Sequence, residues 1–114
     1  MGAPQIVYSA LITNTTTIAV TVVVTYTMPN EMPPETLELL IQPGEEMLAP
    51  QKLVEDGIVT WTGYISKVAI QGGPSMSEPF PGVECPTRRY DFEVFMHAGV
   101  LRLFALGPAE SSSD

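Results

Sequence analysis

Cys85 and His97 are the single thiol and the single imidazole of the chain, and together they form its only candidate pair of nucleophile and general base. A thiolate needs a neighbouring base or positive charge, and Arg88 and Arg89 follow Cys85 closely. A phosphatase-type loop is excluded because Asp91 occupies the sixth position after the cysteine, where an arginine is required. A loop cysteine and a histidine at an exposed strand position are usually incidental. The sequence therefore predicts no enzyme, with an enzyme that uses Cys85 as an alternative.

Metal and cofactor sites lack the ligands that they need. One histidine and one cysteine cannot build a tetrahedral zinc site without several carboxylates. The acidic pairs Glu45-Glu46 and Glu55-Asp56 lie at predicted turns, where adjacent carboxylates are more simply explained by solvent contact than by calcium binding. Gly72-Gly73-Pro74 lacks the lysine and the following helix of a phosphate-binding loop. We therefore expect no metal and no cofactor.

The charge balance limits the classes of partner. Thirteen acidic and five basic residues give a formal charge of −8, which disfavours binding to nucleic acid and to anionic membranes. One cysteine cannot form an internal disulfide, and the N-terminus lacks the pattern of a secretory signal. The longest apolar stretch is too short to span a bilayer as a helix. We expect a cytoplasmic protein with no transmembrane segment, and we interpret the glycosylation-like triplet Asn14-Thr15-Thr16 as a turn.

The strongest structural signal is the stretch 18–28, in which every second residue is large and apolar and most of the others are alanine or threonine. Strict alternation of β-branched residues predicts a strand with one buried face. Such a strand needs neighbours and a second layer, which indicates a sandwich or a barrel. Residues 5–13 alternate in the same way. The loop 14–16 then joins the two stretches either as a hairpin or as an arch between different sheets.

Further strands are expected along the chain. Residues 36–42 alternate, and the following Pro43-Gly44 favours a strand over the competing helix. Residues 47–54 predict another strand, and 58–71 predict a long strand whose apolar pattern changes phase. A bulge near Thr62-Gly63 would keep its large side chains inward. These side chains are Val59, Trp61, Tyr64, Val68 and Ile70.

The clearest hairpin has Ala98-Gly99 as its turn and pairs apolar residues on one face. On the other face it pairs His97 with Val100, Phe95 with Arg102, Glu93 with Phe104, and Asp91 with Leu106. This second face is too apolar for a simple solvated surface, which indicates a patch that binds a partner or is covered by a loop. Arg102 lies between Phe95 and Phe104 and diagonal to Glu93, and we expect a cation–π or ion-pair contact there.

The longest irregular segment, residues 72–89, holds four of the prolines and displays Met76, Phe80 and Val83 between them. A loop of this length is usually functional or poorly ordered. Prolines reduce the entropy that such a segment loses on docking, so it is a candidate binding loop. The alternative is that Phe80 folds back to cover Phe95 and Phe104.

These patterns predict an all-β chain, an antiparallel β-sandwich of about seven to eight strands that is immunoglobulin-like in general plan. Trp61 is present, but the cysteine pair of true immunoglobulin domains is absent. One domain is expected over 1–107, followed by a disordered acidic tail over 108–114.

The predicted function is a non-catalytic protein-interaction module whose partner is another protein or a second copy. Binding would use the 72–89 loop, an apolar sheet face, or both. The residues expected to carry it are Met76, Phe80, Val83, Phe95, Arg102 and Phe104. A protease inhibitor that acts through the loop is an alternative.

Overall fold

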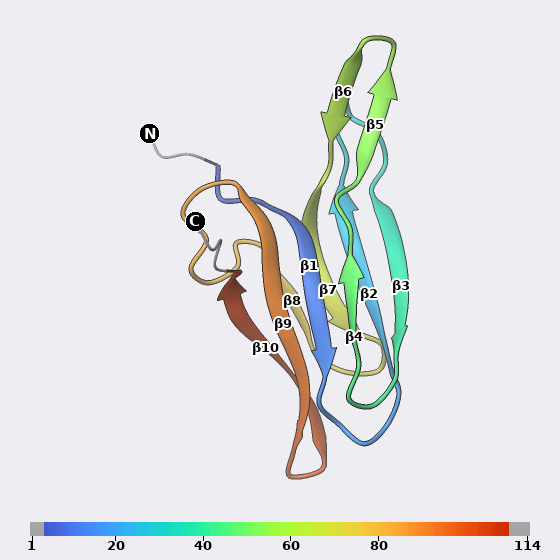
Figure 1. The fold of residues 1–114 in the computed structure, drawn as a ribbon, viewed down its shortest axis with the longest axis vertical. Helices are drawn as coiled ribbons and strands as arrows, with labels where there is room; N and C mark the ends of the chain where they lie inside the picture. Colours follow the sequence, from blue (N-terminus) through green and yellow to red (C-terminus); the bar gives the residue numbers. More distant parts are fainter. Residues whose placement is uncertain (1–3, 110–114) are drawn as a thin grey trace.

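The computed structural model describes residues 4–109 and contains ten strands and no helix in that range (Figure 1). The strands are β1 (Val7–Asn14), β2 (Val20–Thr27), β3 (Glu35–Ile41), β4 (Glu46–Ala49), β5 (Leu53–Asp56), β6 (Val59–Thr62), β7 (Tyr64–Ile70), β8 (Ser75–Ser77), β9 (Thr87–His97) and β10 (Val100–Pro108). The prediction of an all-β chain is confirmed. The described residues contain no helical segment with the length and hydropathy needed to cross a membrane.

Eight of the strands belong to one hydrogen-bonded sheet in the order β10-β9-β1-β7-β2-β3, with β4 pairing β1 and β8 pairing β7. The neighbours are antiparallel except β1 and β9, which run parallel. A single residue pair, Val7 with Ile65, links β1 to β7. The sheet therefore consists of two four-stranded groups, β4-β1-β9-β10 and β8-β7-β2-β3, joined at that pair. β5 and β6 form a separate two-stranded sheet.

Residues 4–109 form ten strands, more than the predicted seven or eight, because two of the expected strands are interrupted and the stretch 72–89, expected to be irregular, contains β8. The stretch 47–54 is divided between β4 and β5 around Pro50, and the stretch 58–71 between β6 and β7 at Gly63. The strand prediction for 36–42 is confirmed by β3. Of the expected tail at 108–114 the structure describes the first two residues: Pro108 ends β10, and the Ala109 N–H donates to the Arg89 carbonyl at 3.0 Å. Residues 110–114 lie outside the described range.

β1 and β2 do not pair with each other. β1 pairs with β4, β7 and β9, whereas β2 pairs with β3 and β7. The loop after Asn14 is therefore the arch, one of the two interpretations that the sequence allowed. It carries the chain from one four-stranded group into the other (Figure 1).

Both groups bury their apolar side chains in one hydrophobic cluster. In β2 the alternation is as predicted, because every second side chain is buried and the intervening ones are partly exposed. The fully buried side chains of largest volume come from both groups: Tyr26, Tyr90, Phe92, Ile12, Ile41, Ile65, Val7, Val22, Val24, Val68, Val94 and Asn14.

The apolar alternation in the stretch 58–71 changes phase at a different residue from the predicted bulge near Thr62-Gly63. Ser66 is the extra residue, since Lys67 pairs with Thr25 and Ile65 pairs with Tyr26. Val68 and Ile70 are buried as expected, and Tyr64 is partly buried. Val59 and Trp61 are exposed, contrary to the prediction, because β6 leaves the main sheet and pairs with β5.

Gly63 marks the point where the chain turns out of the main sheet. A Cβ atom at this position would lie 2.7 Å from the Met28 sulfur and 3.0 Å from the Thr27 carbonyl oxygen. The Met28 sulfur belongs to a flexible side chain, whereas the Thr27 oxygen is fixed in the backbone, so glycine allows the close approach of the two backbones.

The fully buried Asn14 side chain holds the arch together. Its amide nitrogen donates to the carbonyls of Ile18 at 2.8 Å and Ile41 at 2.9 Å. Its carbonyl oxygen accepts from the Thr16 N–H at 2.9 Å and from the Thr16 hydroxyl at 2.7 Å. Each polar atom of this side chain is therefore satisfied in the interior, and the interpretation of the triplet as a turn is confirmed.

Asn14→Ala should lower the free energy of unfolding by about 2–4 kcal/mol, because two buried carbonyls and the Thr16 donors lose their partner. Chemical denaturation followed by far-UV circular dichroism, which reports the strands of the main sheet, measures the change. Gln42→Ala is the control, since Gln42 is exposed and lies next to β3. Equal stability of the two variants would contradict the role assigned to Asn14.

Tyr26 lies near the end of β2, with its hydroxyl donating to the Pro50 carbonyl at 2.7 Å. The Lys52 ammonium is 5.4 Å from the centre of the ring and 3.5 Å from a Glu35 carboxylate oxygen. Burial raises the pKa of Tyr26 to about 12, because the ionised phenolate would lose its contact with water. Tyr26 therefore fixes the crossing from β4 to β5 in its neutral form.

Tyr26→Phe should lower the free energy of unfolding by about 1 kcal/mol at neutral pH, where it removes one hydrogen bond. The pKa of this group is raised in the folded chain, so its contribution is complete below the ordinary pKa of about 10 and is lost as the pH rises toward 12. The stability difference between wild type and variant should shrink by about 1 kcal/mol between pH 9 and pH 11. Denaturation curves across this range would contradict the assignment if the difference stayed constant.

Candidate interaction surface

β9 and β10 form a hairpin with a two-residue turn at Ala98 and Gly99. Their φ angles are +53° and +76°, which is the left-handed pair of a type I′ turn. The predicted cross-strand pairs are confirmed from His97 with Val100 through Phe92 with Ala105. One pair was wrong: Asp91 lies opposite Gly107, because the register shifts between Ala105 and Gly107 and leaves Leu106 as an additional residue.

The outer face of this hairpin is apolar and open to solvent. Val100 is 51% exposed, and Phe104 and Leu106 are each 53% exposed. Phe95 is partly buried, and its ring meets the Phe104 ring edge to face, with 6.5 Å between centroids. We call Phe95, Val100, Arg102, Phe104 and Leu106 the hairpin face.

Arg102 is the one cation on the hairpin face. It is exposed, and within residues 4–109 it forms neither an ion pair nor a cation–π contact. The contact predicted for it is therefore wrong for this chain alone. The reason lies partly in Glu93, whose carboxylate accepts a hydrogen bond from the Thr15 hydroxyl at 3.0 Å. The guanidinium therefore remains available for an external group.

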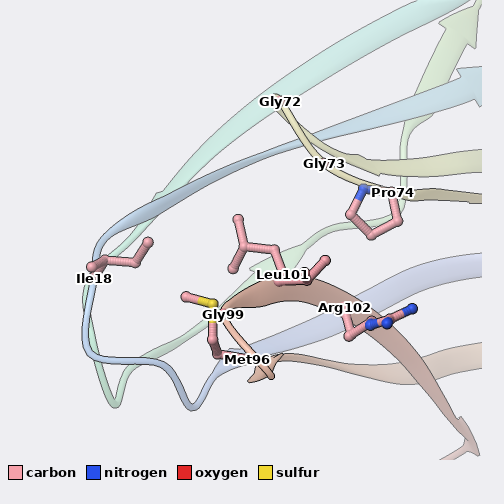
Figure 2. A pocket seen from close by; sticks show the side chains of 9 residues that line it. Ile18, Gly72, Gly73, Pro74, Met96, Gly99, Leu101 and Arg102 are labelled. Carbon is pink, nitrogen blue, oxygen red and sulfur yellow. The ribbon is translucent and has the colours of Figure 1, made fainter.

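A groove of about 710 Å³ adjoins the first residues of β10 (Figure 2). It lies between the β9–β10 turn, the turn that precedes β8, and the arch after β1. Its lining consists of Ile18, Gly72, Gly73, Pro74, Met96, Gly99, Val100, Leu101 and Arg102. The sequence did not reveal this groove because its three segments lie far apart along the chain. The one sequence feature that indicated the groove is the glycine pair at 72–73, which lines it without side chains.

The 72–89 segment does not display its apolar residues. Phe80 and Val83 are 3% and 4% exposed, and Met76 is partly buried against the core. The expectation that these three side chains face a partner is therefore corrected. The segment is held down by β8, which pairs with β7, and by a hydrogen bond from the Glu78 N–H to the Ser66 carbonyl at 2.9 Å.

Phe80 does fold back, but onto a different target from the one predicted. Its ring lies 5.6 Å from Tyr90 and 5.5 Å from Phe92, on the inner face of β9. The Tyr90 hydroxyl donates to the Pro81 carbonyl, and burial raises the pKa of Tyr90. Phe95 and Phe104 lie on the opposite face of the hairpin, so Phe80 leaves them uncovered.

Cys85 and His97 do not form a dyad. Cys85 precedes β9 and His97 ends it, so about ten strand residues separate them, or about 33 Å. Cys85 is exposed beside a groove of about 500 Å³ that Arg88 and Arg89 also line. The Arg89 guanidinium is already paired with Asp91, at 2.9 Å between Nε and Oδ1.

Among residues 4–109, no three metal-ligating side chains lie close enough together to hold a metal ion.

A second apolar surface lies on the arm formed by β5 and β6, which projects from the main sheet (Figure 1). Ile58 at its tip is completely exposed, and Leu53, Val59 and Trp61 are also exposed. This arm was not predicted, because the alternation of Val59 and Trp61 is that of core residues.

Comparison with known proteins gives no assignment: no protein-family model matches the chain, and no curated protein matches it in sequence.

Phe80→Ala should lower the free energy of unfolding by about 3–5 kcal/mol, because it opens a cavity among buried aromatic rings. Phe104→Ala should lower it by only about 1 kcal/mol, since the side chain is half exposed and loses mainly its edge-to-face contact with Phe95. Thermal and chemical denaturation of the two variants make the comparison. Similar effects for both phenylalanines would contradict their different placement.

Proposed function

We infer that this chain is a non-catalytic protein-interaction module whose binding surface is the hairpin face. The observation that supports this is the exposure of Val100, Phe104 and Leu106 along one edge of the sheet, with the cation of Arg102 among them. Such a strip of exposed apolar side chains is unfavourable in water and becomes favourable when a partner covers it. Aromatic residues and arginine are also the residue types that contribute most to protein interfaces.

The proposed scaffold for this surface is an immunoglobulin-like β-sandwich. In support, the groups β4-β1-β9-β10 and β8-β7-β2-β3 share one core and are joined by one residue pair. Figure 1 draws β9, β1 and β4 in front of β7 and β2. We propose a cytoplasmic location, which agrees with the exposed thiol of Cys85.

The two alternative functions have less support. A loop-based inhibitor would need side chains of the 72–89 segment to enter a protease, whereas Phe80 and Val83 are buried. An enzyme that uses Cys85 would need a nearby base, whereas His97 lies at the other end of β9. The hairpin face needs no rearrangement to bind.

Phe104→Lys should weaken association through the hairpin face by about tenfold or more, because it places a charge where apolar contact is formed. Leu40→Lys is the matched control, since Leu40 is 57% exposed on β3. Association is measured by sedimentation velocity of the purified chain and by quantitative affinity capture with each variant as bait. Binding that Phe104→Lys leaves unchanged would contradict the proposed surface.

A further inference from the structure

β10 is an edge strand with an unused side. It lies at the end of the strand order and pairs with β9, and within residues 4–109 no strand occupies its other side. The backbone at Gly82 comes close to the ring of Pro108, so the 72–89 segment lies beside the last residue of β10. The five residues Leu101–Ala105 precede this point and also precede the register shift. An exposed edge of this kind is a template for a further strand.

The turn geometry identifies which backbone groups are unpaired. In a two-residue type I′ hairpin the flanking pair, His97 with Val100, is a hydrogen-bonded pair. Hydrogen-bonded and non-hydrogen-bonded pairs alternate along antiparallel strands. Arg102 and Phe104 therefore bond to β9. The N–H and C=O groups of Leu101, Leu103 and Ala105 point to the open side, where an added strand would pair with them.

We propose that the partner at this edge is a second copy of the chain, whose β10 pairs with the first in antiparallel orientation about a two-fold axis at Leu103. This inference rests on the proposed function and names its partner. The axis places Leu103 opposite Leu103 of the second copy, and Leu101 opposite its Ala105. Because these are the residues with unpaired backbone groups, each pair exchanges two hydrogen bonds.

The same register gives Arg102 the contacts that it lacks in the single chain. On the outer face Arg102 comes to lie opposite Phe104 of the second copy, while its own cross-strand neighbour is Phe95. Each guanidinium is then placed between two aromatic rings, one from each copy. Arginine over an aromatic face is a favourable cation–π arrangement, and no like charges meet across the axis.

Two neighbouring registers fit less well. An axis at Arg102 would place the two Arg102 guanidinium groups opposite each other, and like charges in direct cross-strand pairs are destabilising. An axis at Phe104 would extend the pairing to Gly107, past the register shift and next to Pro108. A two-fold axis midway between two neighbouring residues would place a residue that already bonds to β9 opposite one whose backbone groups are open. The hydrogen-bond ladder between the two copies could then not form.

The decisive experiment is a charge exchange at the paired positions, measured by sedimentation equilibrium. The wild type should form a concentration-dependent dimer of twice 12.3 kDa. Phe104→Lys should raise the dimer dissociation constant by about tenfold or more, because the introduced lysine lies opposite Arg102 of the second copy. Adding Arg102→Glu to Phe104→Lys should restore dimer formation, since opposite charges then meet across the axis. Denaturation curves confirm that each variant is folded.

Each result has a distinct meaning. A wild type that stays monomeric up to millimolar concentration overturns the second copy as the partner. The proposed function survives that result if Phe104→Lys still abolishes binding to another protein and Leu40→Lys does not. If the Phe104→Lys variant dimerises as well as the wild type, the dimer uses a different surface and the inference is overturned. If Phe104→Lys abolishes the dimer and the added Arg102→Glu does not restore it, the proposed register is overturned.

Cysteine cross-linking in a Cys85→Ser background tests the axis directly. With Leu103→Cys the two thiols lie in one cross-strand pair, at a Cα distance of about 5.5 Å that a disulfide can span. With Leu101→Cys the thiols are four residue positions apart along the strand, about 13 Å, and should not join. Cross-linking through Leu101→Cys, or through Phe104→Cys in preference to Leu103→Cys, would overturn the axis at Leu103.

Discussion

The buried carboxamide of Asn14 is the interaction on which the arrangement of the strands depends. Its two donors and its acceptor connect the arch after β1 to the end of β3, so they hold the place where the chain changes from one strand group to the other. Without this polar anchor, residues 5–13 and 18–28 have the pattern to pair as a hairpin. Because such a group is costly to bury unless fully bonded, its satisfied state selects the arch. β1 is then free to pair in parallel with β9, from Val7 with Thr87 to Asn14 with Val94.

Local pattern predicted most of the individual strands. The alternation in β2, the strand choice for β3 and the turn at Ala98-Gly99 follow from side-chain periodicity and turn chemistry, which act over a few residues. For the same reason most of the β9–β10 register was correct. The additional residue at Leu106 was missed although Gly107, whose φ is +114°, follows it, and an isolated glycine in a strand is a signal for a bulge.

The features that could not be predicted depend on contacts between distant segments. Val59 and Trp61 have the alternation of core residues, but β6 pairs with β5 away from the core. Asp56-Gly57 indicates the turn between these strands, whereas no local feature places the hairpin outside the core. Phe80 and Val83 have the composition of a displayed loop, although they complete the core beside Tyr90 and Phe92. Of the predicted binding residues, Phe95, Arg102 and Phe104 remain on an accessible face because a regular hairpin fixes their orientation.

The arm formed by β5 and β6 contributes few side chains to the common core, since Val54 is the one residue of these two strands that packs against it. A two-stranded ribbon is only marginally stable by itself in water, so the arm opens at a free energy well below that of global unfolding. Its amides should therefore exchange with deuterated solvent through local fluctuations while those of β7 stay protected. The boundary between the two regimes falls at Gly63, which makes the arm a separate cooperative unit within a single chain.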